Sequence, residues 1–179
     1  MKRRNEIVKE TELHDRLFPL VEGRVFHVTR RTNLESIFES GGLHPDRKRE
    51  YPTTFGSAYN SYFRNRDCVP VFDLVHPTDE QIESRLTDCW PFMPAKPGAD
   101  IAILILSPDA HGDLVSWIRS REDLVPGEMI VPYVEAGYPT FLPLSLVDEI
   151  IEVEVQEVPD SFHAMHRRLR AEAGGNGAV

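Results

Sequence analysis

The sequence lacks the features that mark several large classes of protein. It holds only two cysteines, Cys68 and Cys89, which are far apart and form no CxxC or Cys/His metal spacing. We therefore expect buried or free thiols in a reducing compartment. The opening MKRRNEIVKE has no apolar signal core, and no apolar run approaches the roughly 20 residues of a membrane helix. These absences predict a cytoplasmic protein with no membrane contact.

Common signatures of catalysis are also missing. The chain has no Gly-rich loop of the P-loop or dinucleotide type, no HExxH and no GxSxG. Catalysis by a nucleophilic Ser or Cys therefore has no support in the sequence, and no metal site is expected.

Positive charge is scarce overall but not everywhere. Over 179 residues there are 20 Lys and Arg against 29 Asp and Glu, a net charge of −9. Such a balance argues against broad, non-specific nucleic-acid binding. However, residues 24–66 hold eight basic and four acidic side chains, whereas residues 67–160 hold four basic and nineteen acidic ones. The basic stretch has two interpretations, a solvated surface or a binding site for an anionic ligand.

Hydrophobic periodicity predicts an α+β fold with helices packed early in the chain. We expect a helical N-terminal arm at 1–23, a main domain at 24–160, and a C-terminal basic helix and tail at 161–179. The predicted strands are 24–29, 68–75, 100–106, 128–134 and 149–158. The predicted helices are 5–21, 33–40 (ended by Gly41-Gly42) and 78–90, with shorter helical pieces at 111–118 and 143–150. A long loop is expected at 44–60, and Pro70 predicts an edge or a bulge in its strand.

Three stretches concentrate residues suited to chemistry. His27 and Thr29 end a strand that feeds a helix, next to a basic pair, which favours anion binding. The stretch 56–74 mixes Tyr59 and Tyr62 with Arg64 and Arg66, a combination that can stack a base and hold phosphate. The third stretch, 127–135, places a glutamate at each end of an apolar run. Each stretch also has a plain structural interpretation, as a hydrogen-bonded His, a loop held by its aromatics, or solvent-facing glutamates.

In this order the stretches resemble the ADP-ribosyltransferase fold. The resemblance spans roughly residues 24–155 and is carried by the His27 strand, the helix ended by GGL, the CVPVFDL strand and the EMIVP segment. Within the fold it is closest to DarT-type toxins, which modify DNA bases, and more distant to RNA 2′-phosphotransferases. The resemblance implies a split β-sheet core, NAD as substrate, and a toxin–antitoxin or phage-defence setting. It also implies single-stranded DNA or RNA as a partner, through residues 24–66.

The resemblance also implies roles for individual residues. His27 holds the nicotinamide ribose, Thr29 lies beside the nicotinamide amide, and Tyr59 or Tyr62 stacks on the ring. Arg64 meets the diphosphate or assists the target base, with Arg47, Arg49 and Arg66 as other candidates. Glu128 is the catalytic glutamate, and Glu135 competes with it for that role. A fixed carboxylate suits this reaction because it stabilises the positive charge that grows on the ribose as nicotinamide departs.

Two other functions remain open at this stage. One is a catalytically inactive member of the fold that acts as a binding module or antitoxin-like partner. It would have a filled cleft or a glutamate that points outwards. The other is transfer of an RNA 2′-phosphate to NAD, which needs several Arg and a His around one phosphate. Only three Arg (Arg85, Arg119 and Arg121) occur between residues 67 and 160, which counts against it.

Overall fold

Eight strands and five α-helices occur in the part of the chain that the structure describes. The structure is a computed structural model and describes residues 1–46, 48, 50–51, 60–89, 92, 100–159 and 165. The strands are β1 (Lys2–Lys9), β2 (Val25–Arg30), β3 (Gly42–Leu43), β4 (Cys68–Asp73), β5 (Ile101–Leu106), β6 (Glu135–Pro139), β7 (Leu142–Pro143) and β8 (Val147–Gln156). The α-helices are α1 (Leu13–Val21), α2 (Leu34–Ser40), α3 (Tyr62–Asn65), α4 (Asp79–Cys89) and α5 (Trp117–Ser120). Short 3-10 helices cover Glu10–Glu12, Arg31–Asn33, Pro108–Asp113 and Leu144–Leu146.

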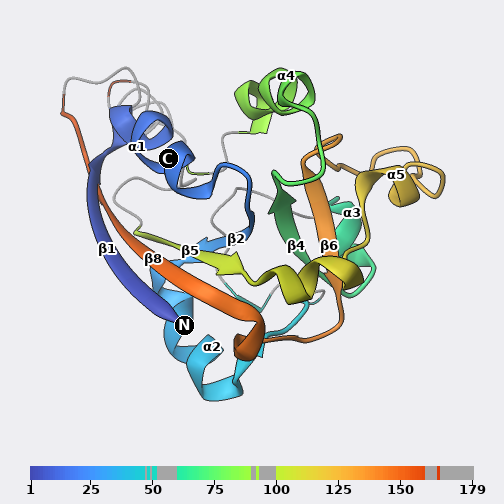
Figure 1. Cartoon of the computed structure of the whole chain (residues 1–179), viewed down its shortest axis with the longest axis horizontal. Helices are drawn as coiled ribbons and strands as arrows, with labels where there is room; N and C mark the ends of the chain where they lie inside the picture. The colour runs from blue at the N-terminus through green and yellow to red at the C-terminus, as the bar shows by residue number, and fades with distance from the viewer. Residues whose placement is uncertain are drawn as a thin grey trace, which may run out of the picture.

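A mixed six-stranded sheet organises these elements (Figure 1). Its strands follow the order β1-β8-β5-β2-β4-β6, and β3 and β7 form a separate two-stranded sheet. β1 runs parallel to β8, whereas the other neighbours in the large sheet are antiparallel. This arrangement of a mixed sheet with helices confirms the expected α+β class.

The core lies on both faces of the sheet around β5. Every residue of Ile101–Leu106 is at most 2% exposed, which explains why this strand is a continuous apolar run rather than an alternating one. One face packs against Leu17 and Val21 of α1, and the other packs against Leu34 and Ile37 of α2. The two helices accordingly lie on opposite sides of the sheet in Figure 1.

Most elements with a strong local pattern are confirmed. The strands expected at 24–29, 68–75, 100–106 and 149–158 are β2, β4, β5 and β8, and the helices expected at 33–40 and 78–90 are α2 and α4. The start of α4 is a capping box, since the Gln81 N–H donates to Thr78 Oγ1 (3.3 Å) and the Thr78 N–H donates to Gln81 Oε1 (3.0 Å). α2 ends at Gly41, whose φ of 75° is the left-handed conformation that glycine adopts without strain.

The helix predicted over 5–21 is wrong in its first half. Lys2–Lys9 are strand β1, which pairs with β8 from Lys2 opposite Glu149 to Lys9 opposite Gln156. The helix begins only at Leu13, where the apolar spacing that predicted it does lead into the core. The N-terminal residues are therefore an edge strand of the main sheet followed by a helix.

The strand predicted over 128–134 is also wrong. The chain turns there, with φ values of 93° at Gly127 and 67° at Tyr133, and the strand begins at Glu135. Met129, within this apolar run, is 64% exposed.

Several weaker expectations are modified or fall outside the description. The helix expected at 111–118 is divided between the 3-10 helix that ends at Asp113 and α5, and within 143–150 only Leu144–Leu146 are helical. Most of the loop at 44–60 and, apart from Met165, all of the C-terminal segment at 161–179 lie outside the described residues. Within the described residues, no helix combines the length and apolar character needed to cross a membrane.

The sheet opens between β2 and β4. These strands pair only at Val25 opposite Asp73 and Phe26 opposite Phe72, whereas β2 pairs with β5 from Phe26 to Arg30. β4 is an internal strand of the sheet, but at Pro70 its ladder partner is Gly137 of β6 and no β2 residue. At Pro70, which has no N–H to donate, β4 therefore has a ladder partner on one side only. This agrees with the edge or bulge that Pro70 predicts.

Candidate functional site

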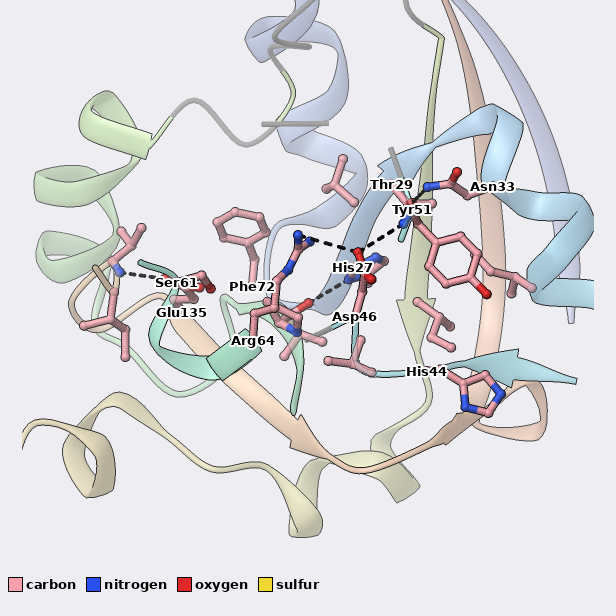
Figure 2. A pocket seen from close by; sticks show the side chains of 18 of the residues that line it. His27, Thr29, Asn33, His44, Asp46, Tyr51, Ser61, Arg64, Phe72 and Glu135 are labelled. Carbon is pink, nitrogen blue, oxygen red and sulfur yellow. Dashed lines mark hydrogen bonds and ion pairs between the residues drawn. The ribbon is translucent and has the colours of Figure 1, made fainter. Parts of the chain in front are cut away.

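A pocket of about 500 Å³ lies where β2 and β4 separate (Figure 2). Its walls come from β2, α2, β3, β4, α3, the segment 129–132 and the first residue of β6. Further residues before α2, between β3 and α3, and on α4 also line it. The volume is within the range of small-molecule sites. Four of the predicted site residues line this pocket: His27, Thr29, Arg64 and Glu135. They come from three elements that are distant in sequence, and the opening of the sheet brings them together.

His27 bridges the opening between the two strands. Its Nδ1 lies 2.7 Å from the carbonyl oxygen of Pro70. A carbonyl only accepts, so Nδ1 carries the hydrogen and donates it, which leaves Nε2 as an acceptor in the neutral ring. Burial lowers the pKa of His27 to about 4, and Arg64 adds to that effect, while the bond to Pro70 opposes it. The ring is therefore neutral near pH 7.

Thr29 lies two residues further along β2 and is tied to the following 3-10 helix. Asn33 Nδ2 donates to Thr29 Oγ1 over 2.9 Å, and both residues are buried. Because Oγ1 accepts this bond, the hydroxyl hydrogen points elsewhere and can donate. Both residues line the pocket and add polar groups to a mainly apolar wall.

Arg64 brings a positive charge into the pocket from α3. Its Nη1 is 3.7 Å from the Asp46 carboxylate, and the two side chains are 15% and 13% exposed. The Asp46 carboxylate also accepts from the N–H groups of Glu50 (2.7 Å) and Tyr51 (3.4 Å). Figure 2 shows Arg64 directed at Asp46 on the side of the pocket near His27. A planar guanidinium in such a position suits a phosphate or diphosphate ligand.

Glu135 opens β6 and is a half-buried acid of the pocket. Its Oε2 accepts from the N–H of Val131 over 2.7 Å. Burial raises the pKa of Glu135 to about 7, and the bond from Val131 offsets part of that effect. In the described part of the chain, no Lys, Arg or His forms an ion pair with Glu135. A positive charge that a ligand brings beside Glu135 therefore stabilises the ionised form of this carboxyl.

The remaining predicted residues are placed elsewhere. Glu128 accepts a 2.6 Å hydrogen bond from Arg66, and neither residue is among those that line the pocket. Tyr62 is 3% exposed and packs edge-on against Phe63, with the Arg66 guanidinium 3.7 Å from its ring centroid. Three further candidates lie outside the described residues: Tyr59, Arg47 and Arg49.

Sequence reasoning missed several residues that line the pocket. Among them are Asn33, Asp46, Ser61 and Arg85. Asn33 had a usable signal, since it lies four residues after Thr29, and it bonds to Thr29. Asp46 lies in a polar loop with no pattern. Arg85 lies on α4, far along the chain, and only the fold brings it to the pocket.

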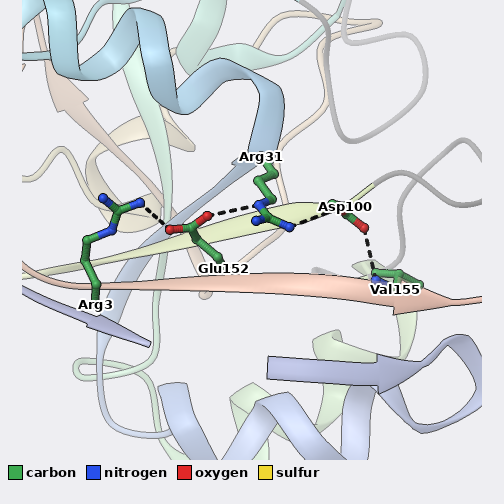
Figure 3. Close-up of polar contacts among 5 residues, drawn as sticks. All are labelled: Arg3, Arg31, Asp100, Glu152 and Val155. Carbon is green, nitrogen blue, oxygen red and sulfur yellow. Dashed lines mark hydrogen bonds and ion pairs between the residues drawn. The ribbon is translucent and has the colours of Figure 1, made fainter. Parts of the chain in front are cut away.

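A second polar cluster lies on the sheet outside the pocket (Figure 3). This Glu152 cluster consists of Glu152 on β8, Arg3 on β1, Arg31 after β2 and Asp100 before β5. Arg3 and Arg31 both donate to the Glu152 carboxylate, the latter over 2.9 Å, and Arg31 also contacts Asp100 at 3.3 Å. The other oxygen of Asp100 accepts from the N–H of Val155 over 3.2 Å. Glu152 is not among the residues that line the pocket. The contacts of the cluster instead connect β8 with β1 and with the segments next to β2 and β5.

Comparison with known proteins adds nothing to this geometry, because no protein-family model, no curated protein and no solved structure matches the chain. Among the described residues, no group of three or more His, Cys, Asp and Glu side chains is arranged to hold a metal ion.

Proposed function

We propose that this protein is an NAD-dependent ADP-ribosyltransferase, with an ADP-ribosyltransferase-like split sheet and the pocket as its NAD site. The observation that supports the proposal is the convergence of His27, Thr29, Arg64 and Glu135 on one pocket where the sheet opens. The resemblance assigns these residues to NAD binding and catalysis without any knowledge of where they lie in space.

The chemistry of each group fits a part of NAD. The Nε2 of His27 accepts from a ribose hydroxyl, and the Thr29 hydroxyl donates to the nicotinamide amide. Arg64 neutralises the diphosphate. Glu135 stabilises the positive charge on the ribose as the bond to nicotinamide breaks.

Of the two candidate glutamates, we assign the catalytic role to Glu135. It lines the pocket, whereas Glu128 is engaged with Arg66 away from it. With its pKa near 7, Glu135 is only partly ionised at neutral pH in the free protein. The nicotinamide ring of NAD carries a positive charge, so its arrival favours the ionised form that the reaction needs.

The acceptor follows from the resemblance, and we propose nucleic acid in a toxin or phage-defence setting. The basic stretch 24–66 supports this less directly than its net charge suggests. Arg31, Arg64 and Arg66 each form an ion pair with a carboxylate. The positive charge available to a nucleic-acid strand is therefore smaller than the eight basic side chains of residues 24–66 suggest.

The pocket favours an enzyme over an inactive binding module, because it is open and Glu135 lies in its wall. One observation favours a second enzyme function, transfer of an RNA 2′-phosphate to NAD. Two arginines, Arg64 and Arg85, and two histidines, His27 and His44, line the same pocket. An RNA substrate with an internal 2′-phosphate distinguishes the two activities.

The proposal is tested by incubating the protein with NAD labelled in the ADP-ribose part and with single-stranded DNA, RNA and 2′-phosphorylated RNA. We expect label on a nucleic acid in the wild type and its loss in Glu135→Gln. By calorimetry, Arg64→Ala is expected to weaken NAD binding about tenfold or more. The matched control is Arg119→Ala, an exposed arginine outside the pocket lining. Absence of NAD binding by the wild type would refute the proposal.

A further inference from the structure

The segment 123–132 forms one wall of the pocket through its last four residues. Hydrogen bonds outside the pocket connect this segment to the C-terminal end of α3. Arg66, just after α3, donates to Glu128 Oε1 (2.6 Å) and to the carbonyl oxygen of Asp123 (3.0 Å). The same guanidinium lies 3.7 Å from the ring centroid of Tyr62. Glu128 Oε2 accepts from the N–H of Val125 (3.3 Å) and closes the turn that contains Gly127. We call the Arg66–Glu128 pair the clasp.

Backbone contacts continue the attachment from the clasp to the pocket. The Met129 N–H donates to Asn60 (2.6 Å), and the Tyr62 N–H donates to Met129 (2.9 Å). From Met129 to Pro132 the segment lines the pocket. The N–H of Val131, three residues after Glu128, then donates to the Glu135 carboxylate. A continuous chain of bonds therefore joins the clasp to Glu135.

We infer that Glu128 is a positioning residue for Glu135: with Arg66 it fixes the segment whose Val131 N–H holds the Glu135 carboxylate. This inference rests on the proposed function for its effect on turnover, but not for its effect on Glu135 itself. It predicts that a substitution of Glu128 lowers activity although its carboxylate lies outside the pocket lining.

The most direct readout is the titration of Glu135. Hydrogen bonding from Val131 lowers the pKa of this carboxyl, whereas burial, the larger cause, raises it. Loss of the Val131 bond with the carboxyl still shielded from water therefore raises the pKa of Glu135 further. The other titratable side chains that line the pocket are His27, His44, Asp46, Tyr51, Arg64 and Arg85. None of these belongs to the clasp or to the 123–132 segment, and they are unchanged in the clasp variants.

The experiment follows the side-chain carboxyl of Glu135 by carbon-13 NMR, with its signal assigned by its loss in Glu135→Gln. We expect the pKa of Glu135 to rise by about one unit in Glu128→Ala and in Arg66→Ala. A smaller rise is expected in Glu128→Gln, which keeps an oxygen that accepts from Arg66. The exchanged pair Arg66→Glu with Glu128→Arg is expected to return the pKa towards the wild-type value. Glu122→Ala, which changes an exposed glutamate just before the segment, is the matched control with no shift.

Turnover of NAD by the same variants completes the test. If the pKa of Glu135 is unchanged in both Arg66→Ala and Glu128→Ala, the inference is wrong. The same holds if Glu128→Gln loses as much activity as Glu128→Ala and the exchanged pair restores none, because Glu128 then acts on substrate. If the titration shifts as expected but the wild type does not turn NAD over, the clasp stands and the proposed function fails. If Glu128→Ala does not fold, Glu128→Gln and the exchanged pair decide.

Discussion

Glu135 and Glu152 are both carboxylates held close to the main sheet, but their surroundings are opposite. Arg3 and then Arg31 hold the pKa of Glu152 below its usual range through hydrogen bonds and positive charge (Figure 3). Glu135 has one backbone donor, and burial raises its pKa to about 7. The carboxylate whose charge is already neutralised joins strands, whereas the one without a positive partner among the described residues lines a pocket. The difference indicates that a positively charged ligand would be stabilised more beside Glu135 than beside Glu152.

The largest expected effect is on activity. Glu135→Gln is expected to lower NAD-dependent transfer about 100-fold or more, since the charge that stabilises the transition state is gone. Glu152→Gln is expected to leave the rate constant close to that of the wild type, measured below the melting temperature of the variant. Equal losses in both variants would remove the functional distinction between the two carboxylates.

The second effect is on the pH dependence of stability. The carboxyl of Glu135 titrates near 7 in the folded protein and near 4.5 when unfolded, so the folded state binds more protons between these values. The free energy of unfolding should therefore fall as pH rises from about 4.5 to 7, by roughly 3 kcal/mol at most. In Glu135→Gln this decline should disappear. The measurement is denaturant unfolding from pH 5 to 8, and parallel curves for the two proteins would contradict the assigned shift.

His27 changes the stability in nearly the same pH range, but in the opposite direction. Its pKa is 6.5 when unfolded and about 4 when folded, so its contribution to stability is complete above 6.5 and is lost as pH falls towards 4. A comparison of His27→Gln with the wild type isolates this effect, because Gln is neutral at every pH. The gap between the two curves should narrow as the solution becomes more acidic, and a constant gap would mean that the imidazole is not held neutral.

The third effect is the loss of stability when the Glu152 cluster is opened. Glu152→Ala leaves Arg3 and Arg31 without their shared acceptor, and we expect the free energy of unfolding to fall by about 2 kcal/mol. Glu154→Ala removes an exposed glutamate from the same strand and is the control. Chemical denaturation of both variants measures the difference. A cost no larger than that of Glu154→Ala would show that the cluster adds no stability.

The smallest effect tests the shape of the cation. Arg31 reaches Glu152 through Nε and Asp100 through Nη1, and a lysine ammonium cannot make both contacts in this geometry. Arg31→Lys is expected to cost about 1 kcal/mol of stability, less than Glu152→Ala. The melting temperatures of the two variants at equal pH provide the ranking, and the reverse order would mean that the Arg31 contacts dominate the cluster.

Local pattern predicted those parts of the fold that depend on neighbouring residues. The strand expected at 100–106 is β5, a continuous apolar run, and the helix expected at 78–90 is α4, which begins with a capping box. β1 was missed because seven of its eight residues are at least partly exposed and only Val8 is buried, so it shows no alternation. Its partner strand begins almost 150 residues later. Register between such distant segments depends on the completed sheet and cannot be obtained from a short window.

The site was predictable where a residue type and its order along the chain carried the information. His27, Thr29, Arg64 and Glu135 were all named from the sequence, and the structure brings them to one pocket. The choice between Glu128 and Glu135 could not be made, because both end the same apolar run. It depends on how the chain turns at Gly127 and Tyr133 and thereby directs one glutamate to Arg66 and the other into the pocket.

The parallel pairing of β1 with β8 also sets an order of events during synthesis. Residues 2–9 are synthesised long before their partner at 149–156, which emerges only after the other strands of the sheet have been made. Until then residues 2–9 have no strand to pair with, and their charged side chains at positions 2, 3, 4, 6 and 9 oppose association with other nascent chains. The contact between Arg3 and Glu152 can form only when β8 arrives, so the edge of the sheet closes as a late step of folding.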